Sequence, residues 1–309
     1  MHYHSILNEQ FPIRKKAEQK NAFLRYATEK AQAIGYSAQV DEIKGSRNLI
    51  VGNPESAKVI FTAHYDTPAT MPFPNFITPR NILFYILYQL LPVACICLVG
   101  GLMVLLCQAA FGITDFATLY AVFMVCYFGC LMLLLYGPAN KNNYNDNTSG
   151  IVTLLHLMEK LPESARKNAA FIFFDNEEKH MQGSGNYAKI HQEIKRNTLV
   201  INLDCVGDGE HFLCIAKRGA ALHALHPLLQ ETLVPADGKS LLHIPALGSV
   251  YPSDQASFRC GVALCACKKA PIWGHYLNRI HTKRDTVCDL TNIDFLTAQL
   301  CAFTEKIDA

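Results

Sequence analysis

Short apolar runs recur along the chain and alternate with longer amphipathic segments. Three of them, KVIFTA at 58–63, AAFIFF at 169–174 and LVINL at 199–203, are rich in β-branched or aromatic residues. Runs of this kind predict strands that are buried on both faces of a largely parallel sheet. Further strands are expected at 37–43, 48–51, 212–216 and 262–267.

The segments between these runs predict helices that cover the sheet. Residues 13–35 are rich in Lys, Glu, Ala and Leu and end at Gly35, a residue that commonly follows the last turn of a helix. Other helices are expected at 150–160, 184–195 and 292–307. Strands that alternate with helices predict an α/β fold, with a mostly parallel mixed sheet covered by helices on both faces.

Two apolar blocks interrupt this alternation. Between Asn81 and Asn140 the only charged residue is Asp115, and residues 82–107 and 116–136 are almost entirely apolar. Each block exceeds the roughly 20 residues that an α-helix needs to cross a bilayer. The segment between them contains Gly112 and can form a tight turn. The pattern therefore predicts an inserted transmembrane helical hairpin, and the alternative is a core or dimer-forming hairpin of a soluble protein.

This insertion divides the rest of the chain. We expect one discontinuous domain made of residues 1–80 and 138–309, with the hairpin at 81–137. Arg80 and Lys141 flank the hairpin, whereas its turn has no Lys or Arg, so the positive-inside bias places the rest of the chain in the cytoplasm. The first residues carry charge without an apolar stretch behind them, which predicts that no signal peptide is cleaved.

Composition narrows the choice of partners. The formal net charge of +2 is close to neutral, whereas nucleic-acid-binding domains are usually strongly basic. We therefore expect no nucleic-acid partner. The 12 cysteines are scattered, and none of them form a C-x-x-C pair. We expect reduced and mostly buried thiols.

Acidic and histidine residues follow the predicted buried strands. The candidates are His64 and Asp66 in HYD, Asp175, Glu177 and Glu178 in DNEE, Asp204 after LVINL, Asp146 in NYNDNTSG and His281 in HTKRDT. Ligands of α/β sheets bind beyond the carboxyl ends of the strands, so these side chains are expected to converge. Imidazole and carboxylate suit zinc, and so much buried negative charge would be costly without cations.

Each candidate also has a simpler interpretation. Asp146 precedes a predicted helix and could be only its N-cap. Glu177 and Glu178 could form an exposed acidic turn, and His64 could be a hydrogen-bonded core histidine. Their number and common position at strand ends favour a metal site.

The motifs FTAHYDT, NYNDNTSG, FFDNEE, INLDCVGDG and HTKRDT resemble, in order and context, the di-zinc aminopeptidase family, metallopeptidase family twenty-eight. That family also includes glutamate carboxypeptidases, glutaminyl cyclases and the inactive transferrin-receptor ectodomain. YPSDQASF, with Ser253 and Asp254, is similar to its substrate-side loop. The resemblance covers the chain except the hairpin and implies a zinc exopeptidase domain.

The resemblance implies a role for each candidate. Asp146 would bridge two zinc ions, His64 and Asp204 would complete one site, and Glu178 and His281 the other. Glu177 would be the general base, and Asp66 would orient His64. His275 is the rival to His281 as a ligand.

The function expected from this resemblance is that of an aminopeptidase, which hydrolyses the N-terminal residues of peptides. The hairpin would anchor it in a membrane. The alternatives are a glutaminyl-cyclase-like acyltransferase and a non-catalytic membrane-bound scaffold. A carboxypeptidase would need a cation for the substrate carboxylate, and Arg259 and Arg279 are candidates. The sequence identifies no protein partner.

Overall fold

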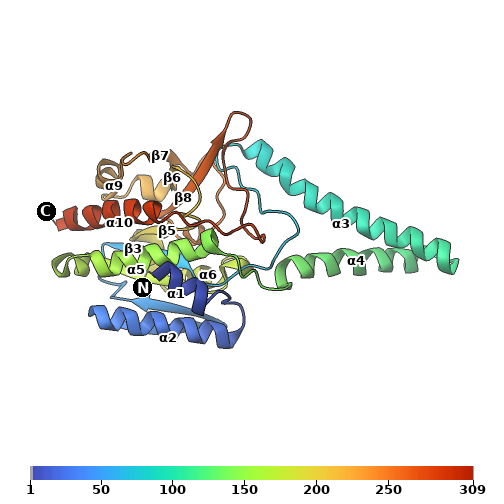
Figure 1. Cartoon of the computed structure of the whole chain (residues 1–309), viewed down its shortest axis with the longest axis horizontal. Helices are drawn as coiled ribbons and strands as arrows, with labels where there is room; N and C mark the ends of the chain where they lie inside the picture. Colours follow the sequence, from blue (N-terminus) through green and yellow to red (C-terminus); the bar gives the residue numbers. More distant parts are fainter. Residues whose placement is uncertain (1–2, 309) are drawn as a thin grey trace.

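A nine-stranded mixed sheet forms the centre of the computed structural model, which describes residues 3–308 (Figure 1). The strand order is β1-β2-β4-β3-β5-β8-β6-β7, and β9 pairs with β8. The strands are β1 Ala38–Ile43, β2 Ser46–Val51, β3 Val59–His64, β4 Ala169–Phe174, β5 Leu199–Leu203, β6 His211–Ala216, β7 Ser240–Pro245, β8 Gly261–Ala270 and β9 Gly274–Tyr276.

The middle of the sheet is parallel, antiparallel pairs flank it on both sides, and the edge strand β7 pairs in parallel with β6. Strand β3 pairs in parallel with both β4 and β5, and β5 pairs in parallel with β8. Antiparallel pairs join β1 to β2, β2 to β4, β6 to β8 and β8 to β9. The predicted mixed α/β sheet is confirmed, and its parallel part is the part that the buried apolar runs supply.

Helices cover both faces of this sheet. Along β3, Phe61 belongs to one hydrophobic core with α2, α5 and α10, whereas its neighbour Ile60 belongs to a second core with α6 and α7. This alternation follows from the two-residue period of a strand. The helices of this domain are α1 Tyr3–Gln10, α2 Ala17–Ile34, α5 Gly150–Lys160, α6 Gln182–Ile190, α7 Gln192–Asn197, α8 Arg218–Ala221, α9 His226–Thr232 and α10 Leu290–Glu305.

The two apolar blocks form long helices that project from the domain (Figure 1). These are α3 Ile82–Phe111 and α4 Phe116–Tyr136, both long and apolar enough to cross a membrane. Gly112 ends α3 in the left-handed conformation, and the Asp115 side chain caps α4 through the Thr118 N–H. Only 11% and 6% of their most apolar stretches are buried, so they are not a core hairpin of the domain.

Specific contacts fix the base of the hairpin to the domain. The Phe76 ring lies 5.6 Å from Phe84 and 5.2 Å from Tyr88 of α3, and it stacks on Tyr276 of β9 at 5.7 Å. At the end of α4, the Lys15 ammonium group donates to the carbonyl oxygen of Gly137 at 3.0 Å. Both ends of the hairpin therefore have a defined position beside the sheet.

Candidate metal centre

Three neighbouring parallel strands carry most of the candidate site. His64 is the last residue of β3, Glu177 and Glu178 follow β4, and Asp204 follows β5. Because the carboxyl ends of parallel strands meet at one edge, these side chains come together. Two further residues arrive from other segments. Asp146 comes from the short helical turn Tyr144–Ser149 before α5, and His281 from the loop after β9.

Asp146 lies between the two histidines. Its Oδ1 atom is 3.2 Å from Nε2 of His64, and its Oδ2 atom is 3.1 Å from Nε2 of His281. His64, Asp146 and Asp204 form one cluster whose ligand atoms lie within 4.8 Å of one another, and Asp146, Glu178 and His281 form another. The two clusters therefore share one carboxylate, with one of its oxygens facing each histidine.

The donor atoms of these clusters fit divalent cations. Within residues 3–308, Nε2 of His64, Oε1 of Glu178 and Oδ1 of Asp204 are buried and have no hydrogen-bond partner. Buried polar atoms are normally paired, because an unpaired one costs about 1–3 kcal/mol. Imidazole and carboxylate oxygen are also the ligand types that zinc takes. The site therefore has the chemistry and the unpaired atoms that a metal centre requires.

The carboxylates of the site carry unfavourable negative charge without a cation. Burial raises the pKa of Glu178 well above its ordinary value, and the Asp146 and Glu177 carboxylates raise it further. Burial likewise raises the pKa of Glu177, where His64 opposes the shift and Asp254 and Asp204 reinforce it. Metal cations at the two clusters would relieve this repulsion.

Asp66 organises the residues around it. Its carboxylate accepts hydrogen bonds from the backbone N–H groups of Glu177 at 3.0 Å and Glu178 at 3.3 Å. Its Oδ1 atom is also 3.5 Å from Nδ1 of His64. Nδ1 of His64 also lies 3.3 Å from the backbone carbonyl oxygen of Asp66. The Asp66 carboxylate therefore holds the glutamate pair beside His64.

Two residues that hold the backbone of the site in place were not predicted from the sequence. Asp285 accepts from the backbone N–H groups of Asn145 and Asp146, each at 3.0 Å. Arg14, which is fully buried, donates to the carbonyl oxygen of Tyr65 and to the side chains of Asn143 and Thr148. Asp285 stands in HTKRDT, one of the motifs, but Arg14 begins the basic run RKK, which is typical of a solvated helix face.

Backbone strain is concentrated around the clusters. His180, Met181, Cys205 and His281 all have left-handed backbone angles, with φ of 63°, 56°, 56° and 63°. Such conformations are uncommon for residues other than glycine and gather at functional sites. They give a sign of function that is independent of the ligand chemistry.

A pocket of about 360 Å³ opens onto the clusters. Asp146, Glu177, Glu178, Asp204 and His281 contribute to its lining, and Tyr251 and Ile280 form part of its wall. Tyr251 donates a hydrogen bond through its hydroxyl to the carbonyl oxygen of Asp204 at 2.9 Å. Tyr251 therefore lies where a substrate would contact it.

Other candidates from the sequence lie elsewhere. Among residues 3–308 no Lys or Arg lines this pocket. Arg259 borders a separate surface hollow, and Arg279 contacts Asp208 at 3.6 Å. His275 is buried in β9 against His211 and belongs to neither cluster. Trp273 lies 5.6 Å from Phe76, in the aromatic contacts at the hairpin base.

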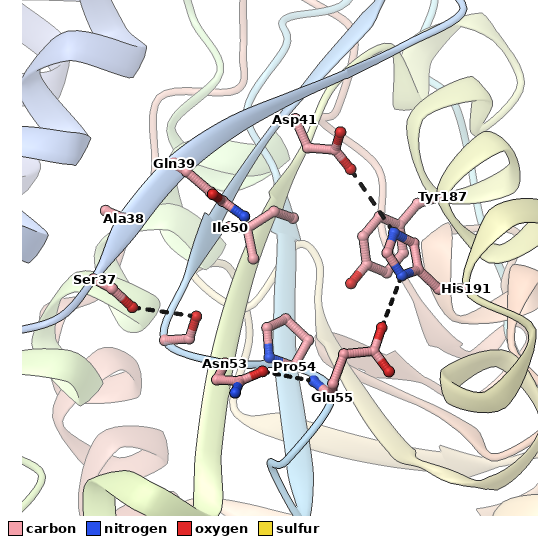
Figure 2. A pocket seen from close by; sticks show the side chains of 11 residues that line it. Ser37, Ala38, Gln39, Asp41, Ile50, Asn53, Pro54, Glu55, Tyr187 and His191 are labelled. Atoms are coloured by element: carbon pink, nitrogen blue, oxygen red, sulfur yellow. Dashed lines mark hydrogen bonds and ion pairs between the residues drawn. The ribbon is translucent and has the colours of Figure 1, made fainter.

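A second pocket of about 370 Å³ lies at the edge of the sheet (Figure 2). There His191 contacts Glu55 at 2.9 Å and Asp41 at 3.9 Å. This pocket shares no residue with the clusters, and both contacts of its histidine are with partly exposed carboxylates. It is not the site that the strand ends build.

The mixed sheet covered by helices is a zinc-exopeptidase-like fold. The model of peptidase family M28 matches residues 137–303, which is more than half of the chain. The chain belongs to peptidase family M28.

Solved structures share the fold at low sequence identity. The LapA aminopeptidase of Legionella pneumophila is 13% identical with a TM-score of 0.54, over 98% of this chain and 69% of that chain. A glutaminyl cyclase of Bacteroides thetaiotaomicron is 14% identical with a TM-score of 0.58, over 98% and 95%. A search of the curated proteins finds no match. At these identities the likeness shows the fold and leaves the reaction open.

Proposed function

We propose that this protein is a two-zinc aminopeptidase that removes N-terminal residues from peptides. The observation that carries the proposal is the shared carboxylate of Asp146, whose two oxygens face the two histidines. Two metal ions about 3.5–4 Å apart need such an anionic bridge. His64 and Asp204 would complete one zinc site, and Glu178 and His281 the other.

Glu177 is the proposed general base. When bound, zinc would lower the pKa of a water molecule and polarise the scissile carbonyl group. Glu177 lines the pocket and lies outside the two clusters that share Asp146, although its carboxylate also lies near His64 and Glu178. In this role it would take a proton from water and pass it to the leaving amine. The hydrogen bond from its backbone N–H to Asp66 holds it beside the clusters.

The charge of the pocket favours an aminopeptidase over a carboxypeptidase. A carboxypeptidase binds a substrate carboxylate, and the described part of the chain offers no Lys or Arg in the pocket. The pocket therefore offers no cationic partner for the carboxylate of a substrate C-terminus.

We also propose that α3 and α4 cross a membrane and that the catalytic domain faces the cytoplasm. Their exposed surfaces are apolar over most of their length. A patch of this size would be unfavourable in water. Arg80 and Lys141 at the base of the hairpin support the cytoplasmic side.

The test is hydrolysis of amino-acid anilides and short peptides by the full-length protein in detergent, with bound metal counted in each sample. We expect release of N-terminal residues, about two zinc ions per chain and loss of activity with a chelator. Glu177→Gln should lower kcat about 10²–10⁴-fold with the zinc retained. Glu163→Gln, an exposed glutamate in the turn Glu163–Asn168, is the matched control.

Other results would overturn the proposal. Cyclisation of N-terminal glutamine without peptide hydrolysis would identify a glutaminyl-cyclase-like enzyme. A folded protein that binds no metal would indicate a scaffold.

A further inference from the structure

The pocket at the metal clusters continues between the two hairpin helices. Its wall includes Tyr85 and Gln89 of α3 and Leu135 of α4. Another pocket, different from the one in Figure 2, lies farther along the same helices. It is almost wholly apolar, has a volume of about 370 Å³ and lies between Pro92, Ile96 and Val99 of α3 and Leu134 of α4. The hairpin therefore forms part of the wall of the pocket at the clusters and borders an open apolar hollow next to it.

Three segments line both pockets in the same order. On α3, positions 85, 89, 92, 96 and 99 follow helical spacing, so one face of the helix runs from the first pocket into the second. On α4 Leu135 lines the first pocket and Cys130, Leu133 and Leu134 line the apolar one, and in the loop before α3 the lining passes from Asn75 to Phe73. The two pockets share no lining residue but adjoin one another, and together they are called the path.

The path is polar near the clusters and apolar farther out. Gln89 is a polar residue in an otherwise apolar stretch, and among residues 3–308 its amide has no hydrogen-bond partner. Polar groups in such helices commonly mark substrate paths. An amide at this point suits the N–H and C=O groups of a peptide backbone. Beyond it, the lining suits apolar side chains.

The path also has a defined length. At Gly100 of α3 the Phe123 ring of α4 approaches so closely that an added Cβ would lie 2.8 Å from it. The helices thus close the path just beyond Val99. From Gln89 to Val99 the rise of a helix gives about 15 Å, which matches about four or five residues of extended peptide.

We propose that the substrates are peptides with an apolar segment of about four residues directly after the scissile bond, drawn from the membrane. This inference rests on the proposed aminopeptidase function. The N-terminal residue would occupy the pocket at the clusters, and the apolar residues would lie between α3 and α4. Because these helices are the proposed membrane spans, a peptide that is already partitioned into the bilayer reaches the path directly.

The test compares two peptides with the full-length protein in lipid nanodiscs. Both peptides begin with the same readily released residue, followed by Leu-Val-Leu-Val in one and Ser-Gln-Ser-Gln in the other. We expect kcat/KM to be at least about tenfold higher for the apolar peptide. Ile96→Gln places a polar group in the path and should reduce this ratio to below about threefold.

Leu98→Gln is the matched control, because Leu98 is 63% exposed on the outer surface of α3 whereas Ile96 is 6% exposed. The control should keep the wild-type ratio, which separates binding in the path from simple partition of the peptide into lipid. A ratio near one in the wild type, or an equal ratio in the two variants, would overturn the substrate proposal while anilide hydrolysis still supported the aminopeptidase. If neither anilides nor peptides are hydrolysed, the aminopeptidase proposal fails and the substrate proposal fails with it.

Discussion

The side chain of Arg14 donates a hydrogen bond from Nε to the backbone carbonyl oxygen of Tyr65, at 2.5 Å. Tyr65 stands between His64 and Asp66, so the contact fixes the backbone on which both residues depend. The same guanidinium group donates to Asn143 at 3.0 Å and Thr148 at 3.1 Å, on either side of Asp146. One buried cation thus joins the end of β3 to the Asp146 turn, about eighty residues farther along the chain.

Replacing Arg14 by Met should therefore destabilise the domain. The apolar side chain keeps much of the volume but leaves several buried acceptors without donors, each worth about 1–3 kcal/mol. We expect the free energy of unfolding to fall by roughly 3 kcal/mol or more, measured by urea denaturation of the detergent-purified protein. Burial lowers the pKa of Arg14 to about 10, so the group stays charged at neutral pH and the loss should persist through this range.

Arg25→Met, on the exposed surface of α2, is the control and should change stability by less than about 0.5 kcal/mol. Arg14→Lys should give an intermediate loss, because one ammonium group cannot reach all the acceptors that the guanidinium reaches. Equal stability of Arg14→Met and the wild type would show that the buried network contributes nothing.

Asp285 gives a second prediction, through its hydrogen bonds to the backbone of Asn145 and Asp146. In Asp285→Asn one acceptor oxygen becomes an N–H₂ group that faces a backbone donor, so the Asp146 turn should shift. Substitutions of such supporting groups typically weaken metal binding 10–100-fold, and we expect zinc affinity to fall by about this factor. Competition with a chromogenic chelator measures it.

Asp294→Asn is the control, since Asp294 lies on the surface of α10 and forms an exposed ion pair with Lys160 at 3.5 Å. Unchanged zinc affinity in Asp285→Asn would mean that the Asp146 turn keeps its geometry without this carboxylate.

The parts of the structure that were predictable from sequence are those with a strong local signal. The runs at 58–63, 169–174 and 199–203 match β3, β4 and β5 to within one residue, because strands buried on both faces are continuously apolar. Strands β7 and β9 were missed, since β7 is largely half-exposed and β9 has only three residues. The predicted helix at 184–195 is two helices, α6 and α7, which meet at His191.

The same distinction holds at the site. The five candidate ligands were found because each follows a strand or stands in a motif, and the structure brings them together. Their role in binding metal stays a prediction. Arg14 was not found, because its partners are carbonyl and side-chain oxygens that only the folded chain brings near it. No local pattern records such a contact.

The hairpin gives a third prediction. Replacing residues 82–136 by a flexible linker should release the domain from membranes, because the exposed apolar surface lies mainly on these helices. We expect the full-length protein to stay in the pellet after alkaline carbonate extraction and the shortened protein to appear in the supernatant. The shortened protein should still fold and bind zinc, since the metal clusters contain no hairpin residue. Loss of folding on deletion would show that the hairpin belongs to the core.

The shared position of Asp146 gives a prediction about the number of bound metals. Asp146→Ala removes a ligand from both clusters that share this residue. Glu178→Gln alters one of these two clusters, the one that contains His281. We expect zinc per chain to fall from about two to near zero in the first variant and to about one in the second. Zinc at about 100 times its dissociation constant stabilises a folded protein by about 2.7 kcal/mol, so it should raise the melting temperature of the wild type by several degrees. This rise should be lost in Asp146→Ala and kept in part in Glu178→Gln, as measured by thermal denaturation beside metal analysis. About one zinc ion per chain in Asp146→Ala would contradict a shared carboxylate, because one cluster would then hold its metal without Asp146.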